Sequence, residues 1–107
     1  MTNEEILNKI LEMNIQDKFF VNFHTLRPGC VDEDGGFVHG VTGTFFECVT
    51  WVIDYFDNNN YIPGFLDSVS TYLNDWGVPD KDASYIGTMW DDNEPDEEYH
   101  VYIRRVS

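Results

Sequence analysis

The chain has little positive charge. Six Lys and Arg residues stand against twenty Asp and Glu among 107 residues, which gives a formal net charge of −14 at pH 7 and an isoelectric point near 4.1. Such a surface repels nucleic acid and anionic membranes and attracts basic protein surfaces. The scarcity of cations therefore argues against direct binding to nucleic acid or membranes and favours a basic protein as partner.

Long apolar runs are also missing. No segment approaches the roughly 20 apolar residues that a membrane-spanning helix requires. Residues 1–5 are polar and acidic, and they lack the basic and apolar regions of a secretory signal. We therefore expect a cytoplasmic protein.

Cysteine is scarce as well, with Cys30 and Cys48 as the two examples. They fit free thiols in a reducing compartment, and a disulfide between them is the less favoured alternative. The histidines His24, His39 and His100 do not combine with them in a C-x-x-C or H-x-x-x-H spacing. The sequence thus predicts no metal site.

Motifs for catalysis are missing too. Cys48 lies within an apolar helical pattern, and Cys30 lies beside three acids that would raise its thiol pKa, so a thiol nucleophile is not expected. The turn at residues 40–44 lacks the lysine of a Walker A motif and the third glycine of a dinucleotide loop. Acidic pairs suited to glycoside chemistry arise by chance among twenty carboxylates. We expect no enzyme activity and no cofactor.

Aromatic residues, in contrast, are plentiful. They make up 16% of the chain, and hydrophobic residues make up 42%. Acidic chains that remain disordered contain few aromatics, whereas large aromatic side chains can fill a packed core. Residues 1–107 are therefore expected to form a single globular domain that carries its charge on the surface.

Hydrophobic periodicity predicts the element order α-β-β-α-α-β-β. The first helix begins with a capping box of Thr2 and Glu5, and either Thr42 or Thr44 can cap the second. The third ends at Gly77, since Pro79 prevents its continuation. The expected helices cover residues 2–14, 45–56 and 65–76, and the expected strands cover residues 18–26, 37–41, 85–90 and 99–106. We expect an α+β domain with an antiparallel sheet of about four strands and helices packed on one face.

The expected core follows from the same periodicity. On the first strand, every second residue is expected to point toward the interior. These residues are Phe19, Val21, Phe23 and Thr25. The last two helices each carry an apolar stripe: Phe45, Phe46, Val49, Val52, Ile53 and Phe56, and then Phe65, Leu66, Val69, Tyr72, Leu73 and Trp76.

The densest charge lies in residues 91–98, hereafter the acidic run, where six of eight residues are acidic. It can be a solvated loop, a contact for a basic partner or a cation site. The EF-hand spacing fails, because Pro95 and Asp96 occupy its fifth and sixth positions. The run is long for a hairpin loop, and Pro95 is expected to prevent strand pairing through it.

Candidate partner-binding residues come from three acidic segments and one aromatic neighbour. Trp90 flanks the acidic run, as aromatic anchors flank charged rims in binding hot spots, although it also suits cross-strand packing. The candidates are Trp90, Asp91, Asp92, Glu94, Asp96, Glu97 and Glu98, then Asp32, Glu33 and Asp34, and finally Glu47, Asp54 and Asp57.

The favoured hypothesis is a small acidic inhibitor that binds a basic nucleic-acid-handling protein, such as a nuclease, with carboxylates in place of phosphates. Phage counter-defence proteins of the anti-CRISPR or anti-restriction type share this charge and size, as do bacterial immunity proteins and antitoxins against nuclease toxins. One alternative is a small enzyme or ligand-binding domain with a pocket lined by Asn22, His24 and His39. An assembly protein that forms a homodimer, and acidity that serves only solubility, also remain open.

Overall fold

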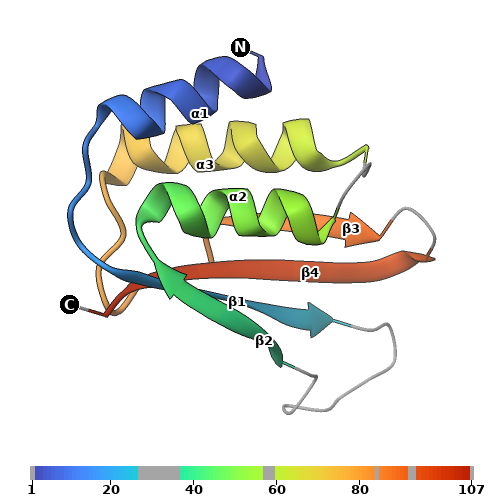
Figure 1. Ribbon diagram of the computed structural model, residues 1–107. Coiled ribbons are helices and arrows are strands. Elements are labelled where there is room, and N and C mark those ends of the chain that lie inside the picture. Colours follow the sequence, from blue (N-terminus) through green and yellow to red (C-terminus); the bar gives the residue numbers. More distant parts are fainter. Residues whose placement is uncertain (1, 27–36, 57–59, 84, 92–93, 107) are drawn as a thin grey trace.

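Three helices lie on one side of a four-stranded antiparallel sheet, as expected from the sequence (Figure 1). The computed structural model describes residues 2–26, 37–56, 60–83, 85–91 and 94–106. The strand order across the sheet is β2-β1-β4-β3, so the long strand β4 pairs with both β1 and β3. The elements are α1 (Asn3–Glu12), β1 (Phe19–Leu26), β2 (Phe37–Gly43), α2 (Phe45–Tyr55), α3 (Ile62–Trp76), β3 (Gly87–Asp91) and β4 (Glu94–Arg105).

Two of the helices begin with complete capping boxes. In α1, Thr2 accepts from the backbone N–H of Glu5 while the Glu5 carboxylate accepts from Thr2 N–H. In α2, Thr44 and Glu47 make the same reciprocal pair, so Thr44 is the cap and Thr42 is not. Each box satisfies backbone donors that a helix start leaves without an intrahelical partner.

Helix α3 begins at Ile62, three residues before the expected start at residue 65. Pro63 lies in the first turn of the helix, where proline is well tolerated because its missing N–H has no acceptor. The helix ends as expected at Gly77, whose φ of 77° is readily adopted by glycine. None of the helices in the described ranges is long and apolar enough to cross a bilayer.

The core lies between the helices and the sheet. Phe19, Val21 and Phe23 are fully buried on the face of β1 that was predicted to point inward, and the Phe19 ring meets the Phe45 ring edge-on at 5.3 Å between centroids. The predicted stripe of α2 is buried at its centre, while Phe46 and Ile53 at its margins are half-buried.

The last hairpin differs from its prediction. Strand β4 begins at Glu94, inside the acidic run, so the unpaired part is shorter than expected, although the pairing is interrupted after Glu94, as expected at Pro95. The register passes from Trp90↔Glu98 directly to Asp91↔Glu94, which leaves residues 95–97 within an irregularity of β4. Proline is tolerated in a strand at such an irregularity, where a ladder hydrogen bond is not required of it.

Candidate protein-binding surface

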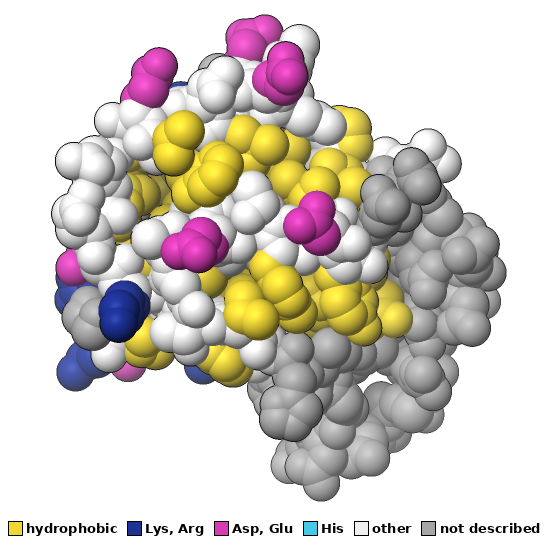
Figure 2. Space-filling view, viewed as in Figure 1, with side chains coloured by type: hydrophobic (Ala, Val, Ile, Leu, Met, Phe, Trp, Pro, Cys, Tyr) yellow, Lys and Arg dark blue, Asp and Glu magenta, His cyan; other side chains and the backbone are white. Residues whose placement is uncertain are grey.

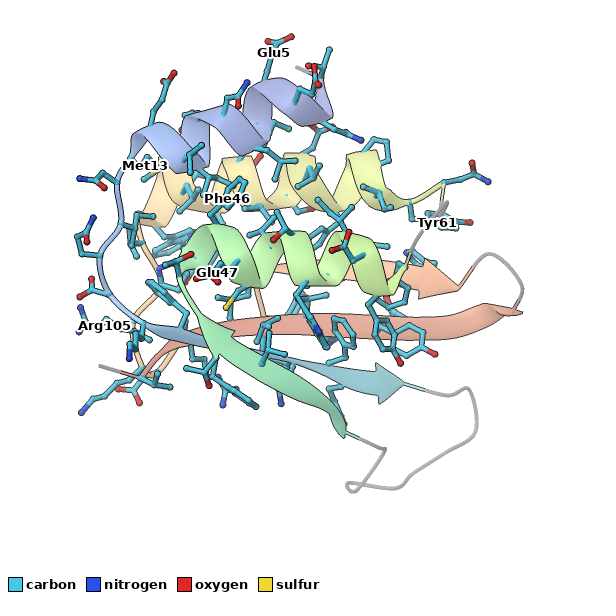
Figure 3. All side chains as sticks on the ribbon, viewed as in Figure 1. Glu5, Met13, Phe46, Glu47, Tyr61 and Arg105 are labelled. Carbon is cyan, nitrogen blue, oxygen red and sulfur yellow. The ribbon has the colours of Figure 1, made fainter. Side chains whose placement is uncertain are left out.

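The exposed surfaces of the three helices are acidic. Seven exposed carboxylates lie on the three helices, against one basic side chain, Lys9, whose Nζ donates to Asn74 Oδ1 at 3.0 Å. Figure 2 shows acidic side chains over α1 and α2, and Figure 3 labels Glu5 on α1 and Glu47 at the start of α2. The seven are Glu4, Glu5, Glu12, Glu47, Asp54, Asp67 and Asp75.

Four of the six basic residues gather elsewhere, at the end of the sheet where β1 begins and β4 ends: Lys18, Lys81, Arg104 and Arg105. Backbone hydrogen bonds join these segments, from Val106 N to Lys18 O at 2.8 Å and from Arg105 N to Asp80 O at 3.2 Å. Asp17, Asp80 and Asp82 lie in the same segments, so the charges at this end nearly balance. The excess negative charge on the helices is therefore not neutralised by most of the protein's cations.

The predicted candidates on α2 are both exposed. Glu47 and Asp54 are seven residues apart, which places them on one side of the helix. Hydrogen bonds from the Thr44 backbone and side chain lower the pKa of Glu47, so this carboxylate is fixed and charged at neutral pH. Asp57, the third member of this predicted group, lies outside the described residues.

The acidic run is only partly described. Glu98 is half-buried, stands opposite Trp90 in the β3–β4 register, and has Oε2 at 3.9 Å from Nε2 of His100. Trp90 is also half-buried, with its ring centroid 6.3 Å from that of Tyr61. Asp92 and the loop residues Asp32, Glu33 and Asp34 lie outside the described residues, as do the side chains of Asp91, Glu94, Asp96 and Glu97.

Among the cysteines and histidines, the structure describes the side chains of Cys48, His24 and His100. Cys48 is free and fully buried, its Sγ donates to Phe19 O at 3.6 Å, and burial raises the pKa of its thiol to about 11. His24 stands opposite His100 across β1 and β4, and the Tyr85 ring stacks on His100 at 4.2 Å. Within the described residues, no group of three His, Cys, Asp or Glu side chains could hold a metal ion. Cys30 and the side chain of His39 lie outside that part of the chain.

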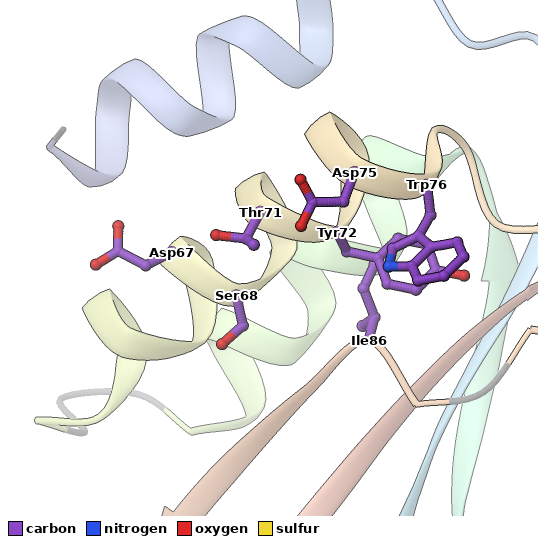
Figure 4. Close-up of a pocket in the computed structure, with 7 residues that line it drawn as sticks. All are labelled: Asp67, Ser68, Thr71, Tyr72, Asp75, Trp76 and Ile86. Carbon is purple, nitrogen blue, oxygen red and sulfur yellow. The ribbon is translucent and has the colours of Figure 1, made fainter.

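A feature that the sequence did not predict is a shallow groove of about 340 Å³ beside α3. Its lining differs from the pocket proposed around Asn22, His24 and His39, and Figure 4 shows its side chains. They are Asp67, Ser68, Thr71, Tyr72, Asp75, Trp76 and Ile86.

Trp76 is the main correction to the predicted core. The hydrophobic periodicity of residues 65–76 predicted that Trp76 belongs to the buried apolar stripe of α3. Its side chain is instead 78% exposed, the highest fraction among the described large hydrophobic residues. Trp76 is the last residue of the helix, immediately before the Gly77 cap, so the stripe continues past the point where the core ends. The sequence does contain one indication that Trp76 is exposed. The acids Asp67 and Asp75, at helical spacing, lie on the row of α3 side chains next to that of Trp76.

Comparisons with protein-family models, with curated proteins and with solved structures find no match for this chain.

Proposed function

We propose that this protein is an acidic binding protein that inhibits a basic, nucleic-acid-handling target such as a nuclease. The observation that supports the proposal best is the charge of the three helices, which carry seven exposed carboxylates and one basic residue, the hydrogen-bonded Lys9. A basic nucleic-acid-binding surface is selected to attract phosphates, and carboxylates on a rigid scaffold offer it the same sign of charge.

The helices provide the rigidity that such mimicry requires. Capping boxes fix the starts of α1 and α2, and all three helices contribute buried residues to one core. Rigid charged groups lose little conformational entropy on binding, and complementary potentials accelerate association. The acidic run and residues 32–34 are further proposed contacts, together with Trp90 as an aromatic anchor.

Among inhibitors of this kind, we favour a phage counter-defence protein directed at a CRISPR or restriction nuclease. The alternative is a bacterial immunity protein or antitoxin directed at a nuclease toxin. Both would present acids to a basic cleft, so the identity of the target distinguishes them.

The test measures inhibition of DNA and RNA cleavage by a panel of nucleases, at low and at physiological salt. Proteins retained from a host lysate by the immobilised chain would be identified in parallel. We expect inhibition that weakens with salt, and retention of basic nucleic-acid-binding proteins. Absence of inhibition at both salt concentrations, with no basic protein retained, would overturn the proposal.

A charge-matched pair of variants locates the contact. The variant Glu12→Gln/Asp54→Asn removes two charges from the exposed surfaces of the helices, and Asp17→Asn/Asp82→Asn removes two from the charge-balanced end of the sheet. We expect the first to slow association by severalfold at low salt and the second to change it much less. If both double variants slowed association equally, binding would depend on the net charge of the protein and not on the surface of the helices.

A further inference from the structure

Two parallel rows of side chains on α3 form one wall of the groove. Asp67, Thr71 and Asp75 follow one another at intervals of four residues, and Ser68, Tyr72 and Trp76 do the same one position later. Side chains four apart lie above one another on a helix, so each row is a continuous strip. Figure 4 shows Ile86, just before β3, beneath the Tyr72 and Trp76 rings as the opposite side of the groove.

The two rows differ in chemistry. The inner part of the groove is apolar and aromatic. There Trp76, whose side chain is 78% exposed, lies beside the half-buried Tyr72 and the buried Ile86. The outer row places the carboxylates of Asp67 and Asp75 about 12 Å apart along the helix axis, with the Thr71 hydroxyl between them. Helix α3 contains no Lys or Arg. An aromatic face beside unneutralised carboxylates is suited to a cation that carries an apolar stem.

The groove also opens beside an edge of the sheet. Strand β3 is the last strand in the order β2-β1-β4-β3, and Gly87 at its start lets α3 lie close against it. A Cβ on Gly87 would approach Phe65 Cδ1 to 3.0 Å and Ser68 Cβ to 3.2 Å. Because β3 is at the edge of the described sheet, an extended chain could run along it and insert a side chain between Trp76 and Ile86, as in recognition by strand addition.

We propose that this groove binds an arginine side chain from an extended, basic segment of the partner protein. The guanidinium stacks on the Trp76 indole and pairs with Asp75, while Asp67 attracts a second basic residue of the same segment. Arginine fits better than lysine, because its planar, weakly hydrated guanidinium both stacks on aromatic rings and pairs with carboxylates. This inference rests on the proposed function for the presence of a basic partner, and adds the point of contact.

The test uses the full chain, labelled with ¹⁵N, and three capped heptapeptides that alternate Gly with Arg, Lys or citrulline. Citrulline keeps the shape of arginine without its charge. We expect the Arg peptide to shift the Trp76 indole N–H and the Thr71 amide signals, the Lys peptide to bind several times more weakly, and the citrulline peptide to cause no shift. Loss of one indole signal in Trp76→Leu assigns that resonance among the three tryptophans.

Variants then separate the groove from general charge. Trp76→Leu keeps apolar area without the aromatic face, and Asp75→Asn removes one carboxylate; each should weaken binding of the Arg peptide roughly fivefold. Asp17→Asn, at the charge-balanced end of the sheet, is the matched control and should leave the affinity nearly unchanged. Circular dichroism checks the fold of each variant, and the high exposure of Trp76 and Asp75 favours its retention.

The outcomes distinguish this inference from the proposed function. If the Arg peptide shifts signals on α2 but not those of Trp76 and Thr71, the groove is not the site. If a nuclease is inhibited equally by the native chain and by Trp76→Leu, the proposed function stands and the groove is overturned. If the peptide binds the groove while no basic protein is bound or inhibited, the groove stands and the proposed function falls.

Discussion

Gly40 and Val21 are in such close contact that residue 40 has no room for a side chain. A Cβ at this position would coincide with the Val21 carbonyl oxygen and would lie 2.6 Å from the Val21 carbonyl carbon. The contact lies where the β1–β2 register shifts, between Val21 and Phe23. Glycine is thus required here by the close approach of two backbones.

Gly40→Ala should therefore destabilise the protein by about 3 kcal/mol, because β2 must move away from β1 to relieve the overlap. The measurement is the midpoint of urea denaturation followed by circular dichroism. Gly64→Ala is the matched control, since a Cβ there meets nothing within 4 Å and alanine favours the helix by up to about 1 kcal/mol. Similar destabilisation of both variants would contradict the structure of the β1–β2 pair.

Thr44→Ala should destabilise the fold by about 1 kcal/mol, because it removes the side-chain oxygen that accepts from Glu47 N–H at 3.1 Å at the start of α2. Thermal denaturation would measure the loss. Thr42, the alternative cap in the sequence, is exposed and lies before the cap, so Thr42→Ala should have little effect. A larger loss for Thr42→Ala would contradict the position of the helix start.

The same capping box predicts a pH dependence for α2. Folding lowers the pKa of Glu47 from its ordinary value of 4.5, so its ionised form is favoured in the folded state. The associated stability is present above about pH 4.5 and is lost as the pH falls through the lower folded pKa. Glu47→Gln keeps the hydrogen-bonding shape but cannot titrate, so the difference in unfolding free energy between the two proteins should change across this acidic range. A constant difference would show that the Glu47 carboxylate makes no such bond.

Cys48 should be unreactive while the protein is folded. Its thiol is fully buried, and burial raises its pKa from 9.0 to about 11, so thiolate is scarce at neutral pH. In a Cys30→Ser background, which leaves Cys48 as the one thiol of the chain, a thiol reagent should label the protein only after urea unfolding. Stability should also decline as the pH rises from about 9 toward 11, where the unfolded chain releases this proton first. Rapid labelling of the folded protein would contradict the buried position.

Local rules were sufficient for most of the fold. Two kinds of local pattern depend only on neighbours within a few residues. They are the capping pairs Thr2–Glu5 and Thr44–Glu47, and the alternation of Phe19, Val21 and Phe23. Such patterns indicate both the type of element and the side that it buries. The element order and the antiparallel sheet followed from them.

The features that were not predicted depend on distant contacts. The start of β4 at Glu94 depends on its pairing with Asp91 of β3, beyond the interruption at residues 95–97. The exposure of Trp76 depends on where the core ends beneath α3, and the groove depends on Ile86 meeting that helix from across the sheet edge. A repeat at helical spacing identifies a face of the helix but not how far the partner surface extends along it.

The separation of charge along the molecule has one further consequence. Strand β4 begins in the acidic run and ends at Arg104 and Arg105, about 37 Å apart if fully extended. The protein therefore has an electric dipole moment as well as a net charge. In the field of a basic surface it experiences a torque that turns its negative side forward before contact, so that fewer collisions begin in the wrong orientation.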